Sequence, residues 1–188
     1  HYATMNDALT GGEGKEADAN STLSLIKDKE LTEDLIIPES ITIHIPDGKT
    51  LSVGENVTLT NEGSIVTDGE IINAGTIKNT EAAILKNEGV VTNTTIGEIY
   101  NEGSIDNNSG QIDNAGLFGG EGTIDNENGK ITSLKGILQN QINNGPNGQI
   151  ISEASWNDGG KKYYGPIDEA IESATNNTDE KVIIIIES

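Results

Sequence analysis

The sequence predicts an all-β protein: a right-handed parallel β-helix, or solenoid, of about 20 residues per coil, with short capping helices at its ends. Three observations lead to this fold class. The chain repeats itself at a nearly constant interval, its aliphatic residues fall into columns at that interval, and an asparagine follows most members of each column.

The repeat is clearest in two pairs of segments. EGSIDNNSGQI (102–112) matches EGTIDNENGKI (121–131) at an offset of 19 residues. NEGSIVTDGEIINAGTI (61–77) matches NEGSIDNNSGQIDNAGLF (101–118), about two units of 20 residues further on. In solenoids with repeats of this length, each unit buries its apolar face against its neighbours, so stacked units share one continuous core.

With this period, the aliphatic residues align in three columns. The first contains Ile45, Ile65, Leu85, Ile105, Ile124 and Ile142. The second contains Leu51, Ile71, Val91, Ile112, Ile131 and Ile150. The third contains Leu59, Ile77, Ile99, Phe118 and Ile137. Neighbouring columns lie about six to eight residues apart, which is not a helical period, so we expect three short strands per coil, stacked in parallel at about 4.8 Å.

Asparagine stands two residues after most column members, where each strand is expected to end. The positions are Asn87, Asn107, Asn126 and Asn144 after the first column, Asn73, Asn93 and Asn114 after the second, and Asn61, Asn79 and Asn101 after the third. We expect these residues to turn the corners in the left-handed conformation, with their amides hydrogen-bonded from coil to coil as a ladder. The glycine that often follows two residues later is expected to supply a second turn at positive φ.

The composition limits the partners. The chain has 31 acidic residues against 11 basic ones, a net charge of −20, so phosphate backbones and anionic lipid headgroups are repelled. We therefore expect no nucleic-acid partner, and no apolar stretch approaches the roughly 18 residues of a membrane span. Cysteine is absent, which fits a secreted bacterial protein without disulfides.

The apolar-x-Asn-x-Gly-x-apolar repeats of residues 36–152 resemble the pectin-lyase-like right-handed β-helices found in bacterial surface proteins and adhesins. The resemblance implies an extracellular, cell-surface or cell-wall location. The alternative left-handed β-helix uses stricter hexapeptides, and the variable spacing of these repeats argues against it.

The two ends of the chain carry a second repeat. YATMNDAL (2–9) aligns with YGPIDEAI (164–171), and each segment is followed by a polar linker and an apolar strand, 21–28 or 181–188. Apolar residues at i, i+3 and i+7 predict a short amphipathic helix in both copies. Helix-strand units of this kind resemble those that open β-helical modules in surface proteins of Gram-positive bacteria.

These signals divide the chain into three parts. Residues 1–30 are expected to form an N-terminal capping helix and the first strand, and residues 31–155 the β-helix coils. Residues 156–188 are expected to form a helix-strand unit that either opens a second module or caps the C-terminal end. The run 182–186 suits a buried strand, which we expect to add to the last coil.

Calcium is the sharpest chemical hypothesis. Asp106 and Asp125 occupy equivalent positions in neighbouring repeats, as do Glu102 and Glu121, so each pair would hold like charges about 5 Å apart. A bound calcium ion would relieve this repulsion. The alternative is a solvated acidic face, and no other cofactor is expected.

Enzymatic activity is the main functional alternative. Polysaccharide lyases share the general fold, and the resemblance implies that their chemistry needs a cationic base beside an acidic, calcium-binding cluster. This chain has no Arg, its lysines are scattered, and one Trp and one Phe can hardly line a sugar-binding cleft. His44 alternates with Ile43 and Ile45, so it is expected on the outward face rather than in a site.

We therefore expect a non-catalytic extracellular β-helix module of a bacterial surface protein, acting as a spacer, a stalk or an adhesive binding module. A carbohydrate or a host-surface ligand, and neighbouring modules of the same parent chain, are the expected partners. The alternative is a carbohydrate-active β-helix enzyme, similar to a polysaccharide lyase or a glycoside hydrolase, that is degenerate or depends on a neighbouring module.

Overall fold

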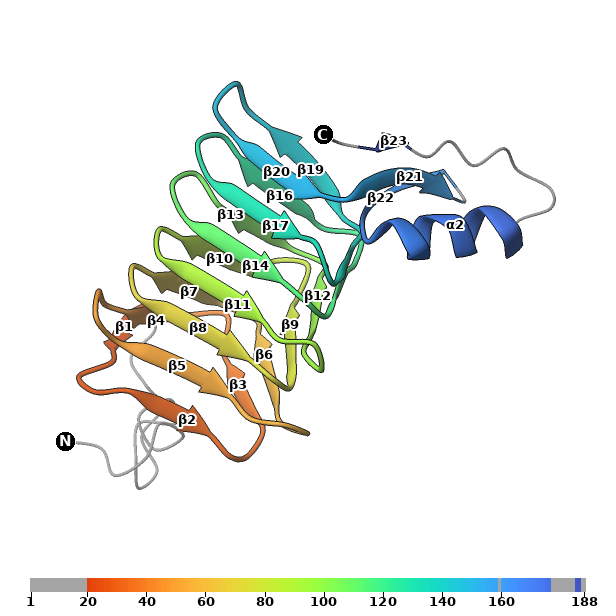
Figure 1. Cartoon of the computed structure of the whole chain (residues 1–188). Helices are drawn as coiled ribbons and strands as arrows, with labels where there is room; N and C mark the ends of the chain where they lie inside the picture. The colour runs from red at the N-terminus through yellow and green to blue at the C-terminus, as the bar shows by residue number, and fades with distance from the viewer. Residues whose placement is uncertain (1–19, 159, 177–184, 187–188) are drawn as a thin grey trace.

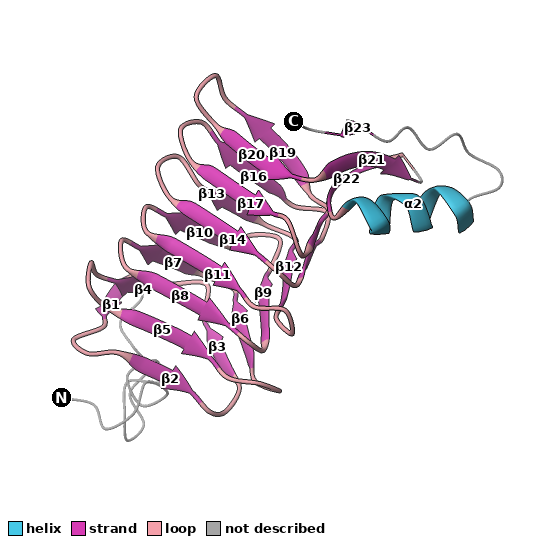
Figure 2. Ribbon diagram, viewed as in Figure 1, coloured by secondary structure: helices cyan, strands magenta, loops and turns pink. Residues whose placement is uncertain are grey.

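The computed structural model describes residues 20–158, 160–176 and 185–186. It confirms the predicted fold class: the chain is an all-β solenoid of about seven turns with one short helix near its C-terminus (Figure 1, Figure 2). Each turn gives one strand to each of three sheets, and the sheets surround a continuous aliphatic interior. At this coarse level the fold fits a pectin-lyase-like β-helix.

Two of the sheets are wholly parallel. Sheet A contains β1 (Ser21–Ser24), β4 (Ile41–Ile45), β7 (Ser64–Thr67), β10 (Ile84–Asn87), β13 (Ser104–Asp106), β16 (Thr123–Asn126) and β19 (Gln141–Asn144). Sheet B contains β2 (Lys29–Leu31), β5 (Thr50–Val53), β8 (Glu70–Asn73), β11 (Val90–Asn93), β14 (Gln111–Asn114), β17 (Lys130–Ser133) and β20 (Gln149–Ser152). The first coil thus includes β1, which we had expected within the N-terminal unit.

Sheet C is parallel at first and antiparallel at its end. Its parallel strands are β3 (Leu35–Ile37), β6 (Thr58–Asn61), β9 (Thr76–Asn79), β12 (Glu98–Asn101), β15 (Leu117–Gly119) and β18 (Ile137–Leu138). Three antiparallel strands follow in the order β22 (Lys161–Gly165), β21 (Ala154–Asp158) and β23 (Ile185–Ile186).

The hand of the coil follows from Figure 1. Strands β5, β8 and β11 cross the near face from left to right while the chain climbs from red to blue, and the chain returns on the far face. This path is right-handed, as is nearly every crossover between parallel strands, because twisted strands pack back onto their sheet only in that hand.

Each strand is short and alternates between the interior and solvent. In β8, for example, Ile71 and Asn73 are buried, whereas Glu70 and Ile72 are only half-buried on the outer face. A four-residue strand therefore sends two side chains inward: one aliphatic residue in the middle and one corner residue at the end.

The register confirms most of the predicted columns. The second column is correct throughout. The first is correct from Ile65 to Ile142, and the third from Leu59 to Phe118. Ile65, Ile71 and other mid-solenoid members are fully buried, so stacking like on like removes each of these side chains from water.

Ile45 was wrongly placed in the first column. The register partner of Ile65 is Ile43, and Ile45 lies at the corner beside Thr67. The turn 46–49 that follows β4 is two residues longer than the equivalent turn between β7 and β8, so counting at a constant period lands two residues too late.

Ile137 was also misplaced, by one residue. Phe118 pairs with Leu138, and Ile137 pairs with Leu117 on the outer row of the sheet. The turn 134–136 between β17 and β18 has one residue more than the turn between β14 and β15. One additional residue in a turn moves the inward positions one place later in the sequence, so counting at a constant period lands on an outward-facing residue.

The predicted asparagine ladder is present at all three corners. At the first corner the Nδ2–Oδ1 distances along Asn87, Asn107, Asn126 and Asn144 are 2.7, 2.8 and 2.6 Å. At the second, Asn73, Asn93 and Asn114 are linked at 2.8 and 2.9 Å, and Asn114 then donates to Ser133 Oγ at 3.1 Å. At the third, Asn61, Asn79 and Asn101 are linked at 2.8 and 2.8 Å. Within the ladders, each of these side-chain bonds is donated by the amide of one coil to the residue of the following coil.

The backbone explanation for these asparagines was wrong. Among the described residues, the non-glycine positions with positive φ are Asn20 and Asn56, and neither belongs to a ladder. The ladder asparagines instead end their strands in ordinary conformation and are 0–4% exposed, apart from Asn144 at the open end of the solenoid. Asparagine is therefore required at the corners for its buried, stackable amide rather than for its tolerance of a left-handed turn.

The glycines after the corners are also explained by space rather than by φ. Gly103 has an ordinary φ, but a Cβ built on it would lie 2.3 Å from the Thr80 carbonyl oxygen and 2.4 Å from that of Ala83. The coils approach so closely at the corner that only a residue without a side chain fits there.

The C-terminal end departs from the repeat. The seventh coil has β19 and β20, but its third side is taken by β22, which forms a hairpin with β21. Helix α2 (Ile167–Asn176) packs on β21, and Ala170 joins Trp156 and Ala154 in a small second core. The Trp156 and Tyr163 rings stack across the hairpin at a centroid distance of 5.5 Å.

The strand expected to add to the last coil pairs elsewhere. Ile185 and Ile186 pair with β21, so β23 extends the hairpin and not β19 or β20. Residues 182–184 and the helix expected at 2–9 lie outside the described residues, and the division of the chain into an end unit, coils and a second end unit stays a prediction.

The amide ladder can be tested at its centre. Asn93 accepts from Asn73 and donates to Asn114, Gly97 O and Leu117 O. Asn93→Ala leaves buried polar groups without partners, so we expect a loss of roughly 3 kcal/mol in the free energy of unfolding, measured by chemical denaturation. The exposed Asn128 is the matched control, and Asn128→Ala should cost less than about 0.5 kcal/mol. Equal losses would contradict the ladder.

The close approach of coils predicts a contrast between two glycines. Gly103→Ala forces a methyl group onto two carbonyl oxygens and should lower the free energy of unfolding by about 1–3 kcal/mol. At Gly119 the nearest atom to an added Cβ is 3.5 Å away, an ordinary contact. Gly119→Ala should therefore leave the melting temperature unchanged or slightly raised, and a matching drop in both variants would refute the steric account.

Candidate functional site

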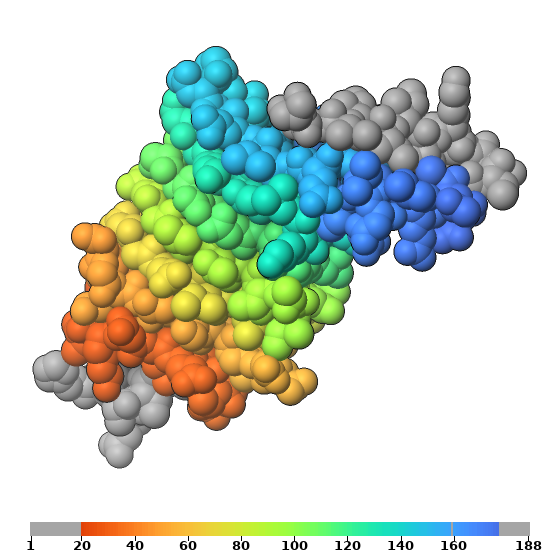
Figure 3. Space-filling model, in the orientation of Figure 1, coloured from red at the N-terminus to blue at the C-terminus, as the bar shows by residue number. Residues whose placement is uncertain are grey.

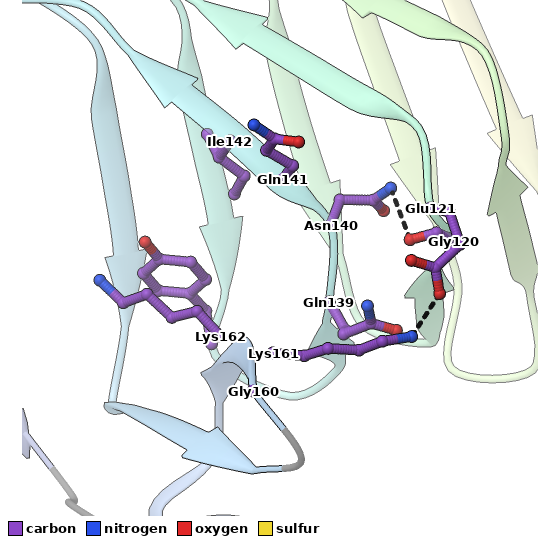
Figure 4. A pocket seen from close by; sticks show the side chains of 10 residues that line it. Gly120, Glu121, Gln139, Asn140, Gln141, Ile142, Gly160, Lys161 and Lys162 are labelled. Carbon is purple, nitrogen blue, oxygen red and sulfur yellow. Dashed lines mark hydrogen bonds and ion pairs between the residues drawn. The ribbon is translucent and has the colours of Figure 1, made fainter.

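The clearest cleft lies where the hairpin meets the last coils. It has a volume of about 390 Å³ and is lined from three directions (Figure 4). The turn before β16 supplies Gly120 and Glu121, the segment around β19 supplies Gln139, Asn140 and Gln141, and β22 supplies Lys161, Lys162 and Tyr164. Amides and ammonium groups therefore dominate the lining.

The cleft begins where the third ladder is interrupted. Gly120 stands at the corner position that follows Asn101, and it has a φ of 124° with an added Cβ only 2.1 Å from Asn101 O. The next coil restores an asparagine, Asn140, which donates its amide to the Gly122, Gly120 and Asn101 carbonyl oxygens at 3.1, 3.3 and 3.5 Å. Asn140 thus spans the gap that the glycine leaves.

Asn140 retains an unused acceptor. Its side chain is 6% exposed, and its Oδ1 has no hydrogen-bond partner in the described part of the chain. A buried carbonyl oxygen without a donor costs free energy, and an ordered water molecule could supply that donor.

An ion pair closes one side of the cleft. Lys161 Nζ contacts Glu121 Oε1, and the hydrogen bond to this carboxylate raises the pKa of Lys161 above its ordinary value (Figure 4). The ammonium therefore stays charged across the neutral range. Because both side chains are well exposed, the pair positions the hairpin tip more than it stabilises the fold.

The other wall is held by aromatic contacts. Lys162 Nζ lies 4.7 Å from the centre of the Tyr164 ring, and Tyr164 is buried against the end of the main core. The stacked Trp156 and Tyr163 rings brace the same hairpin from its helix side. The lysines are thus presented by a supported strand rather than by a free loop.

The structure divides the four predicted calcium ligands into two pairs. Asp106 and Asp125 are register partners on the outer face of sheet A. Glu102 and Glu121 meet at the preceding corner, where Glu102 Oε2 accepts the Glu121 backbone N–H at 3.4 Å. Four residues of extended strand, about 13 Å, separate the pairs along the chain, so the four carboxylates do not form one site.

Each predicted pair already has protein partners. Asp125 accepts from Asn143 Nδ2 at 2.7 Å, and Lys86 is the register neighbour of Asp106 on its other side. Glu121 is paired with Lys161. Within the described residues, no group of three or more His, Cys, Asp or Glu side chains is placed to hold a metal ion.

His44 lies on the outer face as expected, but it is not free. Its Nε2 is 2.9 Å from Asp68 Oδ2, and its Nδ1 is 3.1 Å from Ser24 Oγ. The three residues link the first three coils. Ser24 and Asp68 are exposed on the outer face of sheet A.

Sequence reasoning found Glu121 but missed the rest of the cleft. The signal was the break in the third ladder, where the periodic asparagine is replaced by Gly120 and returns as Asn140. The contributions of Lys161 and Tyr164 could not be predicted, because no sequence pattern indicated that β21 and β22 would fold back onto sheet C as a hairpin.

Comparisons with known proteins add no relative. No protein-family model, no curated protein and no solved structure matches this chain. The assignment to parallel β-helical solenoids therefore rests on the chain's own register and sheet order.

In the part of the chain that the structure describes, no helix is both long enough and apolar enough to cross a membrane.

The calcium hypothesis can be tested by melting. Because each carboxylate pair has a lysine or amide neighbour, we expect millimolar calcium or EDTA to change the melting temperature by less than about 1 °C. A rise of several degrees with calcium that disappears in Asp125→Asn would show instead that Asp106 and Asp125 share an ion.

Proposed function

We propose that this chain is a non-catalytic β-helical module of an extracellular protein at a bacterial cell surface. It acts as a rigid spacer that presents an adhesive cleft near its C-terminal end. The ligand is a neutral, hydroxyl-rich molecule of the carbohydrate class, carried by a host surface or a polysaccharide.

One observation carries the spacer assignment: the interior is filled by aliphatic columns and by amide ladders that connect neighbouring coils. Aliphatic columns and three amide ladders run through successive coils, and most side chains that point inward belong to one of them. A stack in which each coil is bonded to both neighbours resists bending and extends by about 4.8 Å for each coil added. Length and stiffness are the properties a spacer needs.

The adhesive role is supported by the chemistry of the cleft. Gln139 and Gln141 line the cleft, and their amides offer both donors and acceptors. Sugar hydroxyls donate and accept hydrogen bonds in the same way. The charge of Glu121 is engaged by Lys161, which favours a neutral ligand over an ionic one.

The non-catalytic assignment is supported by the lining of the same cleft. Glycoside hydrolysis uses two carboxyl groups about 5 to 10 Å apart on either side of the scissile bond. Glu121 is the one carboxylate among the described residues that line the cleft, and an ammonium group already holds it.

The proposal is tested by binding and turnover together. The chain is passed over immobilised neutral polysaccharides and glycans, and the soluble fraction is assayed for released sugar. We expect retention without release, and retention should fall roughly tenfold in Lys161→Ala, which frees Glu121 and loosens the hairpin tip. Lys86→Ala, which breaks the similar ion pair with Glu88 far from the cleft, is the matched control.

The outcomes separate the alternatives. Sugar release above the buffer blank would reject the non-catalytic assignment and favour a carbohydrate-active enzyme. Failure to retain any glycan, or equal loss in both lysine variants, would reject the adhesive cleft and leave the spacer role alone.

A further inference from the structure

The acidic residues are distributed evenly along the solenoid until the last coil. Each of the five coils between residues 38 and 138 carries three of them: Glu39, Asp47 and Glu55; Glu62, Asp68 and Glu70; Glu81, Glu88 and Glu98; Glu102, Asp106 and Asp113; Glu121, Asp125 and Glu127. The seventh coil, residues 139–152, has no charged residue of either sign. In a chain of net charge −20, one coil has thus been kept neutral.

The neutral coil is also the coil with open strand edges. In the part of the chain that the structure describes, β19 pairs only with β16, and β20 pairs only with β17. Ile142 and Ile150 are consequently half-buried, whereas their neighbours Ile124 and Ile131 are 0% exposed. Ile142 and Ile150, the last members of the first and second columns, therefore lack a stacking neighbour on their C-terminal side in the described part of the chain.

Hydrogen-bonding capacity is left over at the same end. Ser152, which ends the second corner, is 6% exposed, and its Oγ has no partner among the described residues. The Asn144 amide donates to Gly148 O at 2.8 Å but has no following asparagine to receive its other hydrogen. Ladder asparagines that are followed by another coil, such as Asn87, use both, donating to Asn107 Oδ1 and to Gln111 O of the next coil.

A groove runs along β20 at this edge. Its volume is about 510 Å³, and its lining includes Gly148, Gln149, Ile150, Ile151, Lys162 and Tyr164. Among the described residues that line it, Lys162 is the one charged side chain, and none is a carboxylate. Ile151, on the outer face of β20, is itself exposed, so both faces of the edge strand are apolar where a further strand would lie.

We propose that the groove along β20 is a docking site for an extended, uncharged polypeptide segment of a partner protein. The segment adds to β20 as the next strand of sheet B, and its inward aliphatic side chain stacks on Ile150. Main-chain hydrogen bonds supply the affinity in this mode of recognition, and alternate side chains supply the specificity.

The neutrality of the coil identifies this occupant. A strand that joins a stack places each side chain about 4.8 Å from its equivalent, so an acidic edge would repel the acids of an ordinary coil and attract a basic partner. An uncharged edge accepts an uncharged strand. A second copy of this chain is disfavoured, because two bodies of net charge −20 would have to meet end to end.

The probe is a peptide that copies residues 145–152, GPNGQIIS, with acetylated and amidated ends so that it carries no charge. Binding to the full chain is followed by fluorescence anisotropy, and its place by amide hydrogen exchange. We expect saturable binding, with slowed exchange confined to β20 and its immediate neighbours in the groove.

Two isoleucine variants with the same change in charge test the site. Ile150→Asp puts a carboxylate where the aliphatic side chain of the peptide stacks, so the dissociation constant should rise at least tenfold. Ile84→Asp alters an isoleucine that is 49% exposed on the outer face of sheet A, and its affinity should match that of the unaltered chain.

Three results would overturn the proposal. They are the absence of saturable binding at millimolar peptide, protection that appears away from β20, and equal loss of affinity in both variants. Sedimentation of the chain alone decides the remaining alternative, because a dimer that Ile150→Asp dissociates would show that a second copy occupies the edge. None of these results bears on glycan retention, so this proposal and the adhesive cleft fail independently.

Discussion

The structure depends on one constraint: parallel strands of successive coils stack in register, so every side chain meets its own equivalent about 4.8 Å away. Aliphatic residues satisfy this constraint without further conditions, because stacked isoleucine side chains bury one another and form a hydrophobic core. A buried polar residue tolerates it only if it can both donate and accept along the stack. Asparagine meets this condition with a short, planar amide, and it is the residue found at the buried corners of the middle coils.

The ladders have a direction, which explains where they begin. Each amide donates its Nδ2 toward the C-terminal neighbour, so the bonds within a ladder are aligned and can polarise one another. The residues one coil before the ladders, at the same corners, are Ile37, Val53 and Thr67. Ile37 and Val53 have no side-chain donor, and Thr67 Oγ1 makes no hydrogen bond among the described residues. The first asparagines of the three ladders, Asn61, Asn73 and Asn87, accordingly keep a buried Oδ1 without a partner.

The fold can be predicted from the sequence because in-register stacking requires the same residue types to recur at equivalent positions of each coil. The second column could be predicted in full, because its members stay 19–21 residues apart although the individual turns vary from two to four residues. The misplacement of Ile45 and Ile137 came from turns with additional residues, whose length a hydrophobic pattern does not reveal.

The residues of the cleft were harder to predict than those of the columns. Glu121 belongs to the repeat and was found, whereas Lys161 and Tyr164 reach the cleft through a hairpin that breaks the repeat. Departures from periodicity, such as Gly120 in the third ladder, mark the places where a site can form.

The central claim is that stacked buried amides hold the middle coils together, and side-chain amide exchange measured by NMR tests it most directly. The account predicts that the Nδ2 protons of Asn79, Asn93 and Asn107 exchange far more slowly than those of the exposed Asn128 and Asn147. It also predicts that exchange in the ladders accelerates only when the whole solenoid unfolds. Ladder amides that exchange as fast as the exposed ones under native conditions would contradict it.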